Sequence, residues 1–407
     1  MKLLRLKLHW QILIALVLAV LLGYFFPASV KGLSWMGDVF LRSLKMVIIP
    51  LIFSSITSGV TSIGSGRSLG RIGIKTLGYY ISTSLMAILT GLLLVNLIRP
   101  GVGVQLGFTE EAAVPEGAQG EISDIFLRII PENILDAMAR GDVLPVIFFA
   151  ILTGFFISRV EEGYRVQLTT FFEGLFEVMM KITMFVVRFT PLGILGIVSR
   201  EVARNADKLG EIAGSMALYM VTVLLALAIH ATFTLPAIVR FAGRANPLKH
   251  FRNMATPLLT AFSTASSSAT LPLTMEAVEH KSGVSNKISS FTLPLGATIN
   301  MDGTALYECV AVMFISQVYG IELTLAQQMI VVITALLASI GAAGIPMAGL
   351  VMMTVVMTAV NLPLEGIGLI LAVDMLLDMS RTAVNVWSDS CAAVTIARSE
   401  GERTLVR

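Results

Sequence analysis

The sequence carries little charge for a chain of 407 residues. Charged residues make up 14% of it and hydrophobic residues 55%, whereas about a quarter of the residues in soluble proteins are charged. This deficit predicts a membrane protein. The 29 Lys and Arg residues against 27 Asp and Glu give a net charge of only +2. That balance excludes a nucleic-acid binder, which must neutralise many phosphates.

Cysteine and catalytic motifs are also scarce. The two cysteines, Cys309 and Cys391, both lie in apolar sequence, which excludes a disulfide framework and a paired metal site. The four histidines show no metal-ligand spacing, and neither His-Glu-x-x-His nor Gly-x-Ser-x-Gly occurs. Because no nucleophile–base pair supports catalysis, we expect a protein that is not an enzyme.

Long uncharged runs recur along the chain. They cover residues 10–26, 46–66, 76–98, 143–158, 212–239, 254–275, 310–321 and 323–364. A helix needs roughly 20 apolar residues to cross a bilayer. The first run could be mistaken for a secretory signal peptide, but it is longer than the usual core of about 7–15 residues, and further apolar runs follow it. The runs therefore predict an all-α polytopic membrane protein.

The distribution of Lys and Arg predicts the orientation. Basic residues collect at the N-terminus, in residues 67–75 and 240–252 and in the tail, whereas residues 101–123 carry acids but no Lys or Arg. By the positive-inside rule both termini are expected in the cytoplasm. Residues 200–211 disagree, although acids and bases are mixed there.

The run 323–364 is interrupted by Gly and Pro at residues 341–349. An apolar turn of this kind places freed backbone groups inside the membrane, where they are tolerated only when buried in protein or lining a cavity. This predicts a re-entrant hairpin whose tip binds a ligand. Two full spans joined by a short apolar turn are the alternative.

A second candidate hairpin covers residues 254–275, where Pro257 and Pro272 flank a cluster of hydroxyls from Ser263 to Thr270. Such hydroxyls can also serve only to pack helices together. Each candidate hairpin is followed by a helix with buried polar residues. Repeats with broken helices are typical of secondary transporters.

The helix near the C-terminus carries six polar residues on one face, because their spacing follows the helical period. They are Asp374, Asp378, Arg381, Thr382, Asn385 and Asp389. Facing lipid, the four ionisable groups would cost about 10 kcal/mol. One interpretation is an internal salt bridge between Asp378 and Arg381, which leaves Asp374 and Asp389 without a cationic partner. The other is a bound cation together with a charged substrate.

A second polar helix contains Asn300-Met-Asp302-Gly-Thr304 and then Glu308. Glycine beside Asn and Asp favours local unwinding, which frees carbonyl oxygens to join side-chain oxygens around a hard cation such as Na⁺. Glu308 lies in apolar surroundings, where it could carry a proton or remain protonated in a structural role.

Four segments together resemble the glutamate transporter family, the dicarboxylate/amino acid:cation symporters. They are Ser266–Thr270, Asn300–Thr304, Gly341–Pro346 and Asp378–Asp389. The resemblance extends over essentially the whole chain, in order. It implies an elevator-type transporter in the cell inner (plasma) membrane, a homotrimer with eight transmembrane helices and two re-entrant hairpins per protomer, arranged as inverted repeats.

The resemblance also implies two parts. A scaffold that holds the trimer together is expected at residues 1–70, the first two helices, and at 101–205. The transport domain is expected at residues 71–100 and 206–407. Its elements are hairpin 1 (about 247–277), an unwound helix (about 285–318), hairpin 2 (about 324–359) and the C-terminal polar helix (about 363–398).

Roles for individual residues follow from the same resemblance. Arg381 is expected to bind the substrate side-chain carboxylate and Asp378 its ammonium group. Further substrate contacts are expected from Ser266, Ser267, Ser268, Thr304, Ile345, Gly349, Thr382 and Asn385. Glu308 matches the glutamate that carries a proton in animal members.

The resemblance implies three Na⁺ sites. One comprises Gly296, Asn300, Asn385 and Asp389, and a second comprises Tyr80, Thr83, Ser84, Asn300 and Asp302. A third comprises backbone carbonyls around Thr298, Ser339, Ile340 and Ala342. The hydroxyls of the second set, taken alone, are typical of helix packing.

Some positions depart from the family pattern. Ala265 and Met379 stand where other members have a second arginine beside the site, and Trp387 and Ser388 replace smaller residues.

The resemblance predicts a symporter of L-aspartate and L-glutamate coupled to Na⁺, with H⁺ as a further candidate ion and no organic cofactor. The alternatives are a proton-only carrier of acidic amino acids or dicarboxylates, and an anion channel.

Overall fold

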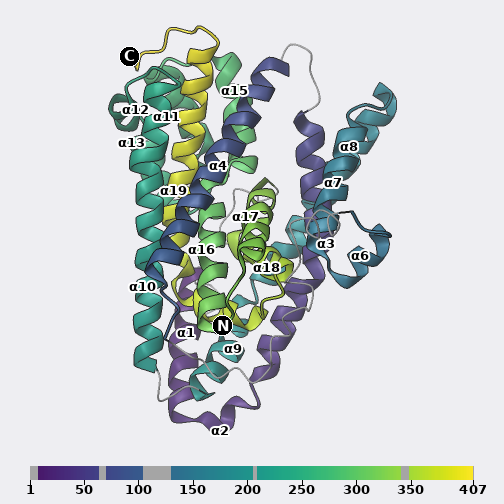
Figure 1. Cartoon of the computed structure of the whole chain (residues 1–407), viewed down its shortest axis with the longest axis vertical. Helices are drawn as coiled ribbons and strands as arrows, with labels where there is room; N and C mark the ends of the chain where they lie inside the picture. The colour runs from purple at the N-terminus through teal and green to yellow at the C-terminus, as the bar shows by residue number, and fades with distance from the viewer. Residues whose placement is uncertain (1–7, 64–69, 104–129, 205–208, 341–347, 407) are drawn as a thin grey trace.

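The computed structural model describes residues 8–63, 70–103, 130–204, 209–340 and 348–406 (Figure 1). Within these ranges the chain is helical and contains no β-strand. The predicted all-α class is therefore confirmed.

One group of helices is built around the long helix α3. Helix α3 packs against α7, α8 and α9, and α1 packs along α9. The elements of this group are α1 (Leu8–Phe25), α2 (Pro27–Val30), α3 (Ser34–Ile63), α6 (Ile134–Arg140), α7 (Val143–Ile157), α8 (Glu162–Val187) and α9 (Thr190–Arg204). We call it the α3 group.

A second, larger group is built around α16 and the 33-residue helix α19. It contains α4 (Gly70–Ile98), α10 (Leu209–Ile229), η4 (His230–Thr234), α11 (Leu235–Phe241), α12 (Pro247–Asn253), α13 (Ala255–Thr264), α14 (Ser267–Glu276), η5 (Ala277–Lys281), α15 (Asn286–Ile299), α16 (Asp302–Val318), α17 (Leu325–Ile340), α18 (Ala348–Ala359), η6 (Leu364–Gly366) and α19 (Ile367–Ser399). We call it the α19 group. Helices α17 and α18 also contact α3 and so lie between the groups (Figure 1).

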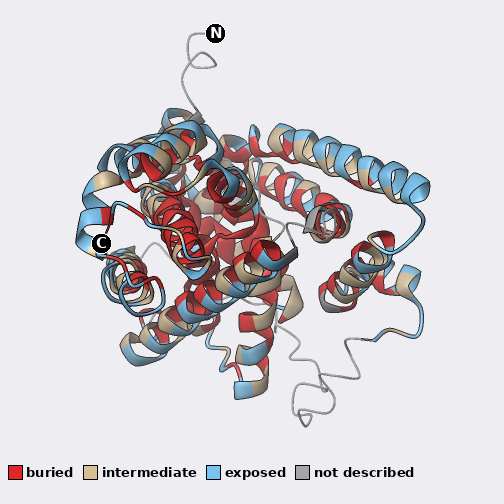
Figure 2. Cartoon of the chain, turned by 90° about the horizontal axis from the view of Figure 1, so that it is seen from above, coloured by how far each residue is buried: buried red, intermediate tan, exposed pale blue. Residues whose placement is uncertain are grey.

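Seen from above, buried residues gather in the middle of the molecule, where neighbouring helices meet (Figure 2). One hydrophobic core extends from Leu51 of α3 to Phe314 of α16, and a second surrounds Val239, Leu293 and Trp387. By contrast, α8 exposes large apolar side chains such as Tyr164, Phe171 and Phe185.

Two of the predicted helix breaks are present. Hairpin 1 turns at Ala265, which has a positive φ of 49°, and Ser266 caps α14 by accepting a hydrogen bond from the Ala269 amide. Helices α15 and α16 are separated at Asn300 and Met301, whose backbone angles are not helical. The predicted unwinding before Asp302 is therefore confirmed.

Hairpin 2 comprises α17 and α18. Its predicted tip, with Ala342 and Ile345, lies outside the described residues.

A π-helical turn, η4, separates α10 from α11. Pro236 follows it in the first turn of α11 and has no N–H to donate to the carbonyl of Thr232. The widened turn accommodates that missing hydrogen bond, and π-turns of this kind often occur at functional sites. His230 begins the turn and is fully buried.

Three described helical segments are long and apolar enough to cross a membrane, at Pro27–Thr61, Arg71–Ile98 and Gly210–Phe241. Helices α8 and α9, bent by 50°, would together form a fourth. Other predicted spans are short, broken or carry buried charges, so the number of eight stays a prediction.

Candidate functional site

The polar face of α19 is directed into the α19 group. Asp374, Asp378, Arg381, Thr382, Asn385 and Asp389 are all buried. Helix α19 packs along α15 and α16, so this face meets the break between those two helices (Figure 1). The prediction that these groups face protein rather than lipid is confirmed.

Arg381 lies at the centre of one half of the site. Its Nε and Nη2 donate to Asp378 Oδ1 at 3.0 and 2.8 Å, and its Nη1 lies 3.2 Å from Asp374 Oδ1. The guanidinium carbon stands 4.0 Å above the centre of the Tyr307 ring, and the Tyr307 hydroxyl donates to Asp374 Oδ1 at 2.6 Å. We call these four residues the arginine cluster.

The expectation that Asp374 lacks a cationic partner is therefore wrong. Asp374 lies two helical turns before Arg381, and the long arginine side chain reaches back far enough to meet both aspartates. The pairing is incomplete, however. Among the described residues, Nη1 of Arg381 and Oδ2 of Asp374 are buried without a hydrogen-bond partner.

Two glycines allow backbone to approach the arginine. A Cβ added to Gly349 of α18 would lie 2.8 to 3.0 Å from guanidinium atoms of Arg381. A Cβ on Gly303 of α16 would lie 2.5 Å from the Arg381 carbonyl oxygen. A larger residue at either position would force Arg381 or the neighbouring helix to shift. The structure thus brings Gly349, a predicted substrate contact, beside Arg381.

Asn385 joins α19 to the first turn of α16. Its Oδ1 accepts a hydrogen bond from the Gly303 amide at 2.7 Å, and its Nδ2 donates to Thr304 Oγ1 at 3.1 Å. Asn385 and Thr304, both predicted substrate contacts, are therefore brought together. Glu308 lies one turn further along α16 and is fully buried. Neither of its carboxyl oxygens has a hydrogen-bond partner in the described part of the chain.

Asp302 is the centre of the other half of the site. Its Oδ1 accepts a hydrogen bond from Ser84 at 2.6 Å and lies 3.3 Å from the Thr83 hydroxyl. Its Oδ2 accepts from Ser388 at 2.6 Å and lies 3.1 Å from His230 Nε2. We call these residues the Asp302 cluster.

Two residues of the second predicted Na⁺ site, Thr83 and Ser84, meet at Asp302. Asn300 of the same predicted site adjoins them, since its Oδ1 lies 3.5 Å from the Thr83 hydroxyl. The prediction missed His230 and Ser388. His230 could have been found as a lone histidine in a long uncharged run. Ser388 could have been found because its helical spacing from Asn385 places it on the same face.

Asn300 links this cluster to Asp389. Its Nδ2 donates to Asp389 Oδ1 at 2.9 Å and to Ser388 Oγ at 3.0 Å. A Cβ on Gly296 would collide with the Asp389 carboxylate and the Tyr80 hydroxyl, so glycine permits their approach. The Tyr80 hydroxyl donates to the Thr292 carbonyl at 2.7 Å.

The remaining predicted residues are less closely grouped. The Thr298 side chain is exposed and its hydroxyl donates within its own helix, to Leu295. Ser339 and Ile340 end α17, which contacts α15. Ser267 is buried and Ser268 exposed in the first turn of α14, which packs against α19.

With this geometry in view, the chain was compared with known proteins. A profile described as the sodium:dicarboxylate symporter family matches residues 8–399. The chain belongs to this family. The match confirms the resemblance drawn from the four motifs, and together with the apolar helices it identifies a membrane-embedded protein of a transporter family.

Named relatives in the sodium:dicarboxylate symporter family match nearly the whole chain. The proton/glutamate-aspartate symporter of Escherichia coli (strain K12) is 34% identical over 98% of this chain and 94% of its own length. The proton/sodium-glutamate symport protein of Geobacillus stearothermophilus is 32% identical over 98% and 96%. Excitatory amino acid transporter 3 of Mus musculus is 37% identical over 94% and 84%.

The chemistry of the Asp302 cluster suits an alkali cation. Within the described residues there is no group of three or more His, Cys, Asp or Glu side chains that could hold a metal ion. The available ligands are carboxylate, amide and hydroxyl oxygens, which hard cations prefer. Among predicted ligands, Asp302, Asn300, Thr83 and Ser84 fit this description.

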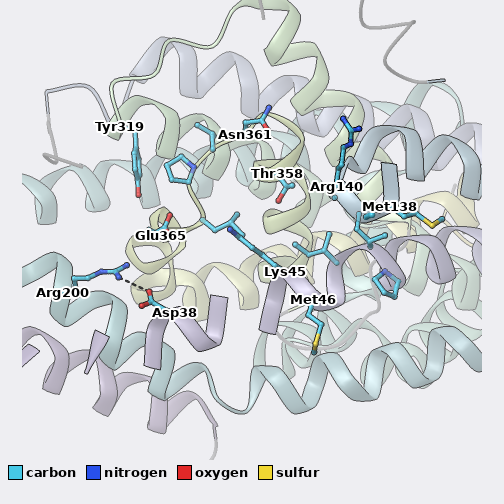
Figure 3. Close-up of a pocket in the computed structure, with 18 of the residues that line it drawn as sticks. Asp38, Lys45, Met46, Met138, Arg140, Arg200, Tyr319, Thr358, Asn361 and Glu365 are labelled. Atoms are coloured by element: carbon cyan, nitrogen blue, oxygen red, sulfur yellow. Dashed lines mark hydrogen bonds and ion pairs between the residues drawn. The ribbon is translucent and has the colours of Figure 1, made fainter. Parts of the chain in front are cut away.

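A cavity of about 1060 Å³ lies elsewhere, between the α3 group and the end of α18. Figure 3 shows Lys45 and Asp38 of α3, Arg140 of α6 and Glu365 of η6 around it. Residues from both helix groups line this cavity. It contains none of the arginine or Asp302 cluster residues, so it is not the candidate site.

Proposed function

We propose that this protein is a secondary active symporter of L-aspartate and L-glutamate driven by Na⁺. The observation that carries the proposal is the buried Arg381, whose Nη1 has no hydrogen-bond partner among the described residues and which is placed next to two aspartates and a cluster of oxygen ligands. The names of the Escherichia coli and Geobacillus stearothermophilus relatives, which include glutamate, aspartate, proton and sodium, support the same substrate and ions.

An acidic amino acid complements the arginine cluster. Its side-chain carboxylate would accept hydrogen bonds from Arg381, whose planar group suits a bidentate carboxylate. Its ammonium group would take over Asp378, which Arg381 occupies in this structure. One internal ion pair is exchanged for two ion pairs with the substrate, so the buried charges remain balanced. Tyr307 and Asp374 would keep the guanidinium in place during the exchange.

Sodium ions would balance the acids on the other side of Asn385. Asp302 would bind one ion with Thr83, Ser84 and Asn300, and Asp389 would bind another with Asn385 and the carbonyls near Gly296. In the described part of the chain, the hydrogen-bond partners of these acids are neutral groups and His230, so a cation would supply the missing positive charge. Carbonyls at Thr298, Ser339, Ile340 and Ala342 would form a third site.

The two helix groups support an elevator mechanism. The scaffold, residues 1–70 and 101–205, corresponds to the α3 group, and the transport domain, residues 71–100 and 206–407, to the α19 group. The exposed apolar face of α8 suits contact with lipid or with neighbouring protomers of a homotrimer. Eight spans with both termini in the cytoplasm of the plasma membrane complete the proposal.

The proposal is tested by uptake of radiolabelled aspartate into proteoliposomes, with Na⁺, H⁺ and K⁺ gradients varied independently. An inward Na⁺ gradient alone should drive accumulation. Uptake that is unchanged when choline replaces Na⁺ would contradict sodium coupling.

A proton-only carrier is the second candidate. It is favoured by the name of the Escherichia coli relative and by the buried Glu308, whose carboxyl oxygens lack hydrogen-bond partners among the described residues. In that case an inward H⁺ gradient would drive uptake in the complete absence of Na⁺.

A further inference from the structure

Ser388 lies between the oxygens of the first two predicted cation sites. Its side chain is fully buried, donates to Asp302 Oδ2 at 2.6 Å and accepts a hydrogen bond from Asn300 Nδ2 at 3.0 Å. The same nitrogen of Asn300 donates to Asp389 Oδ1 at 2.9 Å. A continuous chain of hydrogen bonds therefore runs from Asp302 through Ser388 and Asn300 to Asp389. We call it the Ser388 bridge.

The neighbouring Trp387 holds this turn of α19 in place. Its indole nitrogen donates to the Ala231 carbonyl in the π-turn η4 at 3.0 Å. Its ring also stacks on His250, with the ring centres 5.2 Å apart. Because Trp387 is anchored to two other elements, the Ser388 hydroxyl has a defined position relative to both acids.

A cation at Asp302 would disturb this bridge. The predicted ligands Thr83 and Ser84 would place the ion at Asp302 Oδ1, whereas Ser388 donates to Oδ2. An ion bound at Oδ1 would draw charge from the carboxylate and make Oδ2 a weaker acceptor, so that the serine hydroxyl can turn away from Asp302. Its lone pair then no longer points at the Asn300 amide, and the amide is released from its present geometry. Asp389 Oδ1 loses part of its hydrogen bonding and becomes more available to a second cation.

We propose that Ser388 couples the two cation sites, so that occupation of one site raises the affinity of the other. The inference rests on the proposed sodium symport and assigns Ser388 a positioning role within it. Coupling between two binding sites typically changes affinity about 5- to 150-fold. Without the serine hydroxyl, the two sites should bind more independently.

Direct Na⁺ binding can be measured because Trp387 adjoins the bridge. Trp10 and Trp35, the other two tryptophans, are 53% and 57% exposed, whereas Trp387 is 2% exposed. The background protein is the purified full chain with the substitutions Trp10→Phe and Trp35→Phe, in which Trp387 is the remaining tryptophan. Na⁺ is added stepwise in the absence of aspartate, and the fluorescence of Trp387 is recorded. The same titration is carried out with Ser388→Ala added to the background protein.

Ser316→Ala serves as the matched control. Ser316 is also buried, and its hydroxyl donates to Met313 of its own helix at 2.8 Å. Ser388→Gly provides a second variant that removes the same hydroxyl, should Ser388→Ala give little folded protein.

In the background protein and Ser316→Ala we expect a steep curve. For two strongly coupled sites, about a nine-fold rise in Na⁺ carries the signal from 10% to 90%, against about eighty-fold for independent sites. In both Ser388 variants, the rise in Na⁺ that carries the signal from 10% to 90% should widen towards about eighty-fold.

A curve of unchanged width in both Ser388 variants, or a background curve that is already eighty-fold wide, would overturn the inference. Aspartate uptake by the background protein distinguishes failure of the coupling from failure of the proposed symport. If uptake depends on Na⁺ but the Ser388 variants give titration curves of unchanged width, only the coupling is contradicted. If uptake needs no Na⁺, both the coupling and the sodium symport are contradicted.

Discussion

The arginine cluster and the Asp302 cluster compensate buried acids in different ways. Asp374 and Asp378 share a permanent cation, Arg381, from their own helix. Asp302 instead receives hydrogen bonds or close contacts from Ser84, Thr83, Ser388 and His230, drawn from three different elements. In the arginine cluster, a zwitterionic substrate can replace the ion pairs within the protein. Among the described residues, the Asp302 cluster contains hydrogen-bond donors but no permanently charged cation, so it suits the binding of a cation.

The strongest test of this difference is Arg381→Ala. It leaves two buried aspartates without their cation, and breaking a buried ion pair typically costs about 3–5 kcal/mol. We expect aspartate uptake in proteoliposomes to fall below detection. Sodium-induced Trp387 fluorescence should persist, because the Asp302 cluster is intact. Retained aspartate uptake would show that Arg381 does not bind the substrate.

Asp302→Asn tests the other cluster. It keeps the shape of the side chain but removes the charge that a cation would neutralise. We expect the Na⁺ concentration for half-maximal uptake to rise by about ten-fold or more, equivalent to about 1.4 kcal/mol or more. Aspartate affinity at saturating Na⁺ should change much less. If only the aspartate affinity changed, the two clusters would not divide their tasks as proposed.

Gly349→Ala tests how closely α18 must approach the arginine cluster. A Cβ there meets the guanidinium at 2.8 to 3.0 Å, so either the arginine or the helix must shift. We expect aspartate affinity, measured by calorimetry in saturating Na⁺, to fall about ten-fold, since small displacements of a charged contact are costly. Gly214→Ala is the control, because no other atom lies within 4 Å of its added Cβ.

Glu308→Gln tests whether Glu308 takes part in proton coupling. The substitution keeps the size of the side chain and removes its exchangeable proton. We expect Na⁺-dependent exchange to continue, while the pH dependence of net uptake between about pH 5 and 8 becomes several-fold flatter. An unchanged pH profile would remove the proton from the proposed mechanism.

The smallest effect is expected at Glu400, which follows α19. Its carboxylate pairs with Arg71 and Lys75 of α4, and hydrogen bonds from Lys75 and then Arg71 lower its pKa. A lowered pKa stabilises the folded protein above the unfolded pKa, and this contribution is lost as pH falls through the folded value. Glu400→Gln should therefore lower the melting temperature slightly at pH 7 and leave it unchanged in acid. An equal shift at both pH values would contradict the ion pair.

Local sequence was enough to predict the elements of the site. The helical period placed Asp374 to Asp389 on one face, and the exclusion of charge from lipid turned that face inward. Asn300 beside Asp302 and Gly303 predicted the break before α16, and the hydroxyl cluster from Ser263 to Thr270 predicted the hairpin that turns there. The family motifs then supplied roles, which remain proposals.

Contacts between helices could not be predicted in the same way. The sequence alone favoured an unpaired Asp374, but in the packed structure Tyr307 of α16 donates a hydrogen bond to it, and Arg381 of its own helix reaches back to it. His230 and Ser388 reach the same oxygen of Asp302 only because η4 and α19 converge there.

The sequence by itself therefore determined the all-helical membrane class, the broken helices and which residues share a face, because these depend on composition and on the period of one helix. Tertiary structure alone decided which acid meets which donor. Those distances depend on how closely two helices approach, and Gly296, Gly303 and Gly349 set that approach by the side chain they lack.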